Sequence, residues 1–150
     1  MAFDAFLKIQ TIKGDSVSEK FRDWIVVESF SWGEERPPNG AGGVAVPLEV
    51  QLVTNAQSSS ANLFAACASG ENLGTVNLHL VRAGELSLIF MKWDLDDAVI
   101  GSYRLAGNTA DTTPADQFSI AFSTFTYAFT TQDAKGGATN TVTKTVTFGD

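Results

Sequence analysis

The residues that could carry catalysis in this chain are few and stand apart from one another. His79 is the only histidine and Cys67 the only cysteine among the 150 residues. A Ser–His–acid or Cys–His arrangement places an imidazole beside a nucleophile. His79, however, lies inside an alternating segment, on the parity opposite to Leu78 and Leu80. We therefore predict a histidine at a strand surface or interface, a buried structural thiol at Cys67, and no catalytic residue.

The remaining candidate chemistry is ligand binding by acids or glycines. Asp94, Asp96 and Asp97 are clustered, but they lack the spaced ligands, central glycine and terminal glutamate of a calcium loop. The glycines of NGAGG, residues 39–43, precede no Lys–Ser/Thr pair and no helix, which a phosphate-binding loop requires. One cysteine and one histidine cannot supply a zinc cluster. We predict no metal and no cofactor, and a solvated strand end at the three aspartates.

Composition limits the class of partner. The chain has 10 basic and 17 acidic residues, a net charge of −7, so nucleic acid and anionic membranes are poor partners. Only 18% of the residues are charged, below the typical ~25%, although 44% are hydrophobic. The length predicts one domain over residues 1–150. The low fraction of charged residues beside the high fraction of hydrophobic ones favours an interaction protein over an enzyme.

The start of the chain, MAFDAFLKIQ, has no basic and then apolar signal-peptide pattern, and the apolar runs are too short to insert into a membrane. We therefore expect synthesis in the cytoplasm, with any export by another route.

Period-two alternation predicts that most of the chain forms short strands. They are expected at 3–13, 24–33, 44–53, 75–82, 85–94, 98–105, 118–130 and 141–148. Within 24–33, one parity carries Trp24, Val26, Phe30 and Trp32. Pro47 favours an edge or a bulge, and we predict a hairpin turn at Ala83–Gly84.

One segment indicates a helix of about residues 59–69. Serines at 58–60 suit its N-cap and Gly70 suits the left-handed position after its end. Leu63, Phe64 and Cys67 form a narrow apolar stripe that would press against a sheet. The chain is thus expected to be mostly β with one short α-helix.

The segment FSIAFSTFTYAFT, residues 118–130, changes parity partway along. Phe118 and Ile120 share one parity, whereas Phe125 and Phe129 share the other. A β-bulge near Ser123–Thr124 would return both sets to one side, and this is the interpretation that we favour. The alternative is a continuous strand whose second half presents its opposite face to the helix or to another subunit.

Several quoted segments occur in an order that resembles the haemolysin-coregulated protein (Hcp) family, the tube subunit of bacterial type VI secretion. They are DAFLKIQTIKGDS, ESFSWG, a glycine-rich loop, SSANLFAACASGENLGTVNLHLVRAG and FSIAFSTFTYAFTTQD. The resemblance spans nearly the whole chain. It implies a compact antiparallel β-barrel of two packed sheets with the helix on its side.

The resemblance also implies a function. Six copies would close into a hexameric ring, rings would stack into a tube, and a contractile sheath would expel that tube behind a spike protein. The lumen of some members holds and stabilises effector proteins, and export needs no cleaved signal peptide. The loop at 34–43 would correspond to the loop used at ring-to-ring contacts. Its candidate residues are Glu35, Arg36, Pro37, Pro38, Asn39, Gly40, Gly42 and Gly43.

Two other functions remain open. A monomeric β-barrel could bind a small apolar ligand or a carbohydrate in a pocket lined by Trp24, Trp32 or Trp93. A hydrolytic enzyme is the third reading, because paired carboxylates need not be close in the sequence.

Overall fold

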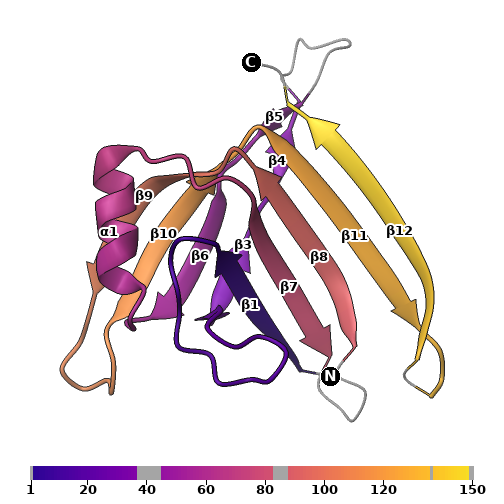
Figure 1. Cartoon of the computed structure of the whole chain (residues 1–150), viewed down its shortest axis with the longest axis horizontal. Helices are drawn as coiled ribbons and strands as arrows, with labels where there is room; N and C mark the ends of the chain where they lie inside the picture. The colour runs from indigo at the N-terminus through magenta and orange to yellow at the C-terminus, as the bar shows by residue number, and fades with distance from the viewer. Residues whose placement is uncertain (1, 37–44, 83–87, 136, 149–150) are drawn as a thin grey trace.

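The computed structural model describes residues 2–36, 45–82, 88–135 and 137–148. They form two antiparallel sheets, a two-stranded ribbon and one helix (Figure 1). The six-stranded sheet has the order β12-β11-β8-β7-β1-β2, the four-stranded sheet has the order β3-β6-β10-β9, and β4 pairs with β5 in the ribbon. The elements are β1 (Phe3–Ile9), β2 (Ile25–Val27), β3 (Ser29–Ser31), β4 (Glu34–Glu35), β5 (Val46–Pro47), β6 (Val50–Asn55), α1 (Ser60–Ser69), β7 (Val76–Arg82), β8 (Ile89–Asp96), β9 (Val99–Ala106), β10 (Ala115–Ala121), β11 (Thr124–Gln132) and β12 (Ala138–Thr147).

The hydrophobic core lies between the two sheets. We call the face that each sheet turns toward this core its inner face. Leu7 of β1 and Leu78 of β7 are buried from one sheet, and Leu52 of β6 and Phe118 of β10 are buried from the other. Alternate residues of a strand point to opposite faces of its sheet. The apolar residues that recur with period two in the sequence are therefore the ones that point into this core.

The predicted mostly-β, antiparallel architecture with one short helix is confirmed, but the predicted barrel is not closed. In the described part of the chain, β12 and β2 end the six-stranded sheet, and β3 and β9 end the four-stranded sheet. No described strand joins these edges across the two sheets. The molecule is therefore a two-layer sandwich with free edges.

Two segments that we predicted as single strands are each divided between the sheets. The chain leaves the six-stranded sheet after β2 and enters the four-stranded sheet at β3, with Glu28 between them. It returns between β10 and β11, through Phe122 and Ser123. The inner faces of stacked sheets point in opposite directions. At both crossings one or two residues lie outside the strands, and the parity of the buried residues changes across them.

This crossing corrects the interpretation of residues 118–130. Phe118 and Ile120 are buried from the four-stranded sheet, and Phe125 is buried from the six-stranded sheet. The predicted bulge at Ser123–Thr124 is wrong, and so is the continuous strand. The register irregularity of β10 lies elsewhere, between Ser119 and Ile120 in its pairing with β9.

The predicted strand 24–33 shows the same effect. Ile25 and Val27 are the buried residues of β2, and Val26 is exposed. This is opposite to the parity that we predicted for this half of the segment. Phe30, after the crossing, packs against the core as predicted.

The helix is confirmed at Ser60–Ser69 and ends at Gly70, whose φ of 71° is left-handed. Two details differ from the prediction. Ser59 makes no side-chain capping hydrogen bond, and Phe64, predicted on the buried stripe, is 60% exposed. Leu63 and Ala66 are the buried residues of α1, which packs against β9.

The remaining boundaries follow local chemistry. Pro47 lies in the ribbon strand β5, a position that its missing N–H favours. The predicted turn at Ala83–Gly84 lies outside the described residues. Within the described ranges, no helix has the length and apolar character needed to cross a bilayer.

Candidate interaction surface

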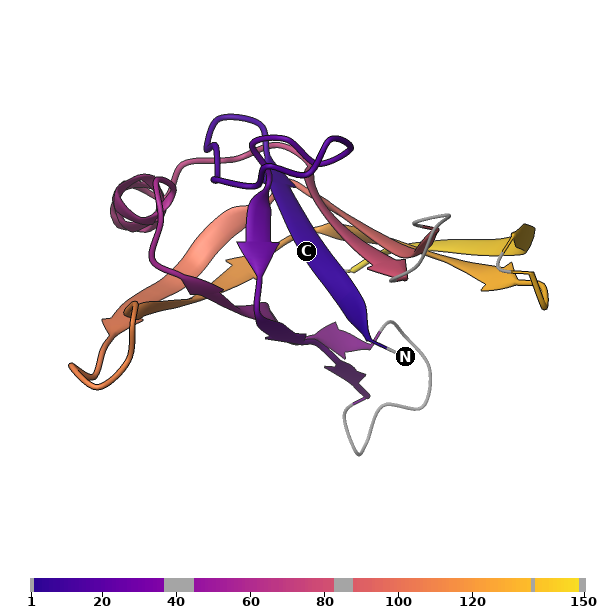
Figure 2. The ribbon, with the colours of Figure 1, turned by 90° about the horizontal axis from the view of Figure 1, so that it is seen from below.

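The β11–β12 hairpin projects beyond the rest of the fold. Figure 2 shows both strands extending past the four-stranded sheet, on the side opposite to α1. β12 is the edge strand of its sheet, and all ten of its residues are exposed. A long exposed edge strand with unpaired backbone groups is a template for association with another chain.

The inner face of this hairpin is apolar apart from one lysine. Cross-strand register places Phe125 opposite Val146 and Phe129 opposite Val142. Tyr127 and Lys144 form the pair between them. The same parity of β11 pairs with core-facing residues of β8, which fixes this face as the inner one.

The opposite face of the hairpin is lined with threonines. Their hydroxyl groups pair across the two strands at distances of 2.8–3.1 Å, in the pairs Thr124–Thr147, Thr126–Thr145 and Thr130–Thr141. A fourth hydroxyl pair, Thr131–Thr139 at 2.7 Å, lies where the register shifts near the end of the hairpin. Such cross-strand pairs stabilise an antiparallel ribbon and fix its register. The hairpin therefore has one hydroxyl face and one apolar face.

An open groove of about 310 Å³ runs under the apolar face. Val142 is 53% exposed and Val146 is 43% exposed, although both point toward the inner side of the sheet. The groove is lined by Trp32, Glu34, Phe125, Tyr127, Phe129, Val142, Lys144, Val146 and Phe148. Apolar residues on the core side of a sheet are normally covered, so this surface is suited to a partner.

Packed aromatic rings form the floor of the groove. The rings of Trp32 and Phe125 are stacked, with centroids 4.0 Å apart and planes 12° apart. Trp93, which is buried, lies 5.4 Å from Phe125. Large rings fixed by several neighbours keep their rotamers, so the groove is held in shape by the core beneath it.

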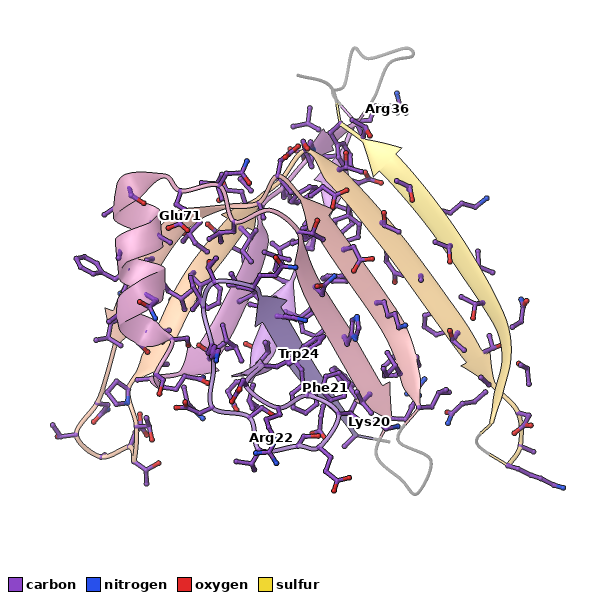
Figure 3. All side chains as sticks on the ribbon, in the orientation of Figure 1. Lys20, Phe21, Arg22, Trp24, Arg36 and Glu71 are labelled. Atoms are coloured by element: carbon purple, nitrogen blue, oxygen red, sulfur yellow. The ribbon has the colours of Figure 1, made fainter. Side chains whose placement is uncertain are left out.

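The predicted ring-stacking loop begins beside this groove. Glu35 is the last residue of β4 and Arg36 follows it, at the top of Figure 3. The indole N–H of Trp32 donates a 2.7 Å hydrogen bond to the carbonyl of Leu48, which ties the two ends of the loop together. The other predicted residues lie outside the described residues: Pro37, Pro38, Asn39, Gly40, Gly42 and Gly43.

His79 lies on the outer face of the six-stranded sheet, against the loop at 13–24. Its ring is 4.9 Å from Trp24 and 6.1 Å from Phe21, and Figure 3 shows these two aromatic residues over the sheet. Its Nδ1 is buried and has no hydrogen-bond partner among the described residues. Burial lowers the pKa of His79 below its ordinary 6.5. These contacts make His79 a half-buried packing residue.

The other candidate residues of the sequence also make structural contacts. Cys67 is partly buried and packs against the core, as predicted for a structural thiol, although it is not fully enclosed. Asp94 accepts a 2.6 Å hydrogen bond from Asn77 Nδ2, Asp96 accepts one from Thr75, and Asp97 accepts one from Ser123. Among the described residues, no group of three or more metal-ligating side chains could hold an ion.

A buried carboxylate that we did not predict holds the helix to the sheet. Asp116 of β10 is fully buried and accepts hydrogen bonds from Ser60 Oγ at 2.5 Å and from Tyr103 at 2.6 Å. Burial, together with the hydrogen bond and charge of Asp116, raises the pKa of Tyr103 to about 12. The only sequence signal for Asp116 was an acid two positions before the apolar run that starts at Phe118.

The three tryptophans of the ligand-binding alternative do not line one pocket. Trp32 borders the groove, Trp93 is in the core, and Trp24 lies on the outer face of the six-stranded sheet. The groove residues were visible in the sequence as Val142 and Val146 alternating with threonines. The exposure of these valines was not visible, because it depends on the position of β12 in the sheet.

Comparison with known proteins gives one family. The sequence model of "Type VI secretion system effector, Hcp" matches residues 6–129. No curated protein matches the chain. The structure of Hcp1 from Salmonella typhimurium is similar at a TM-score of 0.84 with 25% identity, covering 99% of this chain and 96% of that chain.

Two further structures show the same fold. A type six secretion system protein has a TM-score of 0.90 with 22% identity, covering 97% of this chain and 96% of that one. A type VI secretion system effector from Yersinia pestis has a TM-score of 0.79 with 19% identity, covering 96% and 99%. The family match covers most of the chain, and these structures share its two-sheet architecture with the helix at one side. The chain therefore belongs to the Hcp family of type VI secretion.

Proposed function

We propose that this chain is a structural subunit of a type VI secretion tube, in which six copies close into a ring and rings stack. Membership of the Hcp family supports the type VI context. The observation that carries the self-assembly is the β11–β12 hairpin, whose inner face is apolar and is left exposed by the described residues of one copy. Burying such a face against a neighbour releases it from water and stabilises the assembly.

The mechanism that we propose is geometric. A cyclic ring uses head-to-tail contacts, in which one patch of each copy packs against a different patch of the next. The loop that contains Glu35, Arg36, Pro37 and Pro38 and the residues 39–43 would then contact the next ring. Spike, sheath and effector proteins are the proposed partners, with effectors carried in the lumen. The protein would be made in the cytoplasm and exported through the apparatus without a cleaved signal peptide.

The proposal assigns the chain no enzymatic activity and no cofactor. His79 and Cys67 have packing roles, and they lie in different elements, β7 and α1. The role of the protein would thus come from its surfaces rather than from a reactive centre.

Native mass spectrometry and negative-stain images test the proposal. We expect a particle of six times the 16.0 kDa chain, seen as closed rings. A strictly monomeric protein at high micromolar concentration, with no rings in the images, would refute it. Binding of a small apolar molecule by that monomer would instead support the binding-module alternative.

A further inference from the structure

The two sheets of one copy are offset, so each extends past the other on an opposite side. The six-stranded sheet ends in the β11–β12 hairpin, and the four-stranded sheet ends in β9 with α1 beside it. Figures 1 and 2 agree that the hairpin and α1 lie on opposite sides of the molecule. We call these the hairpin overhang (β11 and β12) and the helix overhang (β9 and α1).

The helix overhang also has exposed apolar residues on its inner side. Leu105 of β9 is directly opposite Asp116 of β10, which is fully buried and shares its parity with the core residue Phe118. Residues opposite each other in an antiparallel pair point to the same face, so Leu105 is on the inner face. It is nevertheless 56% exposed.

Phe64 extends this apolar surface onto the helix. Its ring lies 6.3 Å from Tyr103, which is on the inner face of β9 beside Leu105, and it is 60% exposed. Phe64 and Leu105 are thus exposed on two adjacent elements near Tyr103, and together they form an apolar patch of the kind found at contacts.

The two overhangs belong to opposite layers, which makes them complementary. The four-stranded sheet does not extend over the hairpin overhang, and the six-stranded sheet does not extend over the helix overhang. We infer that the hairpin overhang of one copy packs over the helix overhang of the next, so that Val142 and Val146 meet Leu105 and Phe64. The inference rests on the proposed function, and it names the two surfaces that close the ring.

The apolar face of the hairpin overhang is large enough to form a substantial part of an interface between two copies. A hairpin whose longer strand has ten residues is roughly 34 Å long and about 10 Å wide, or on the order of 340 Å² on one face. This is almost half of the ~800 Å² per partner in a standard interface. The free edge of β12 adds backbone groups to the same contact, and each copy in a closed ring is held by two such contacts with two different neighbours.

The charges bear on the contact as well. Lys144 is the only charged residue of β11 and β12, and it lies on the apolar inner face. Both copies carry a net charge of −7 and repel overall, and Lys144, the one charge on the two hairpin strands, reduces this repulsion at the contact.

Thiol cross-linking tests which surfaces meet. In a Cys67→Ser background, Val142→Cys and Leu105→Cys are combined in one chain and treated with a short bis-maleimide. We expect a ladder of covalent oligomers that ends at six copies. The control combines Leu105→Cys with Val17→Cys, an exposed position outside both overhangs, and should give no ladder.

The outcomes separate the inference from the proposed function. Rings that form without a cross-linked ladder would overturn the inference and leave the tube function standing. Dimers from Val142→Cys alone would also overturn it, because they indicate a symmetric contact between two hairpins. Absence of rings from the unmodified protein would overturn both.

A second variant guards against poor folding of the cysteine mutants. Phe64→Glu places a charge at an exposed site, so the fold should persist, as far-UV circular dichroism can check. We expect the protein concentration needed for half-maximal ring formation to rise at least about tenfold. Val17→Glu is the matched control and should leave ring formation unchanged. Equal ring formation by both variants would contradict the inference.

Discussion

The surroundings of His79 favour the neutral imidazole. Burial is the largest cause of its lowered pKa, the charge of Lys92 lowers it further, and Lys8 adds a smaller effect in the same direction. Asp94 acts in the opposite direction. The buried Nδ1 has no acceptor among the described residues, so protonation there would create an unpaired donor.

This environment predicts a loss of stability in mild acid. A folded-state pKa below the unfolded value of 6.5 means that the unfolded chain binds more protons, so the free energy of unfolding falls as pH falls below 6.5. Above pH 6.5 the neutral imidazole dominates in both the folded and the unfolded chain, so His79 no longer lowers the free energy of unfolding. His79→Phe should keep the ring packing and remove this pH dependence, as measured by urea unfolding at several pH values.

The comparison is direct because the chain has no other histidine. If the wild type and His79→Phe lose stability with the same slope between pH 7 and 6, the account of His79 is wrong.

At the scale of elements, the loop at 13–24 depends on one close backbone contact. A Cβ at Gly14 would lie 2.5 Å from the carbonyl oxygen of Trp24 and 2.6 Å from the Cα of Ile25. The Gly14 N–H also donates a 2.8 Å hydrogen bond to the Asp23 carbonyl. Both neighbours are backbone, so they cannot move aside as a flexible side chain would.

Gly14→Ala should therefore separate this loop from the sheet and uncover Phe21. We expect a loss of more than about 1 kcal/mol in the free energy of unfolding, measured with urea. Gly33→Ala is the matched control, because its Cβ would have Leu48 Cδ1 at 3.8 Å as its nearest contact. That variant should stay within about 0.5 kcal/mol of the wild type. Equal stability of the two variants would contradict this description of the loop.

The sequence predicts those elements whose signal is local. α1 follows from its alanines and from Gly70, and β7 follows from the regular alternation of Val76, Leu78 and Leu80. The crossings at Glu28 and Ser123 do not follow, because period-two alternation is the same whichever sheet receives the strand. A parity change indicates that the buried side has switched, but only long-range pairing decides between a bulge and a change of sheet.

The candidate surface was predictable only in part for the same reason. Alternation of Val142 and Val146 with threonines identifies an amphipathic strand. Phe64 looked like a core residue, since it is next to Leu63 in a short apolar stripe. Whether such residues are covered depends on the offset between the layers, which is a property of the whole fold.

At the scale of the whole molecule, ring closure and ring stacking are expected to be separable. The two overhangs lie in strands and a helix, while the proposed stacking loop leaves the fold at Arg36. Deleting residues 36–42 should leave single rings folded and closed, because such a loop contributes little to the core, and it should weaken stacking. Electron microscopy of ring and tube populations measures both. A deletion that unfolds the monomer would show that the loop is part of the core.

The two crossings described above, and a third between β8 and β9, have a consequence for folding cooperativity. β2 continues into β3, β10 continues into β11, and β8 connects to β9 through Asp97 and Ala98 alone, so the two sheets share short covalent connections at three points. Neither sheet can separate from the core without pulling on strands that belong to its partner. We expect the sandwich to melt as one unit, with both layers lost in a single two-state transition. A subunit built this way does not populate a state in which one layer is unfolded. This suits a protein whose apolar hairpin stays exposed until a neighbouring copy packs against it.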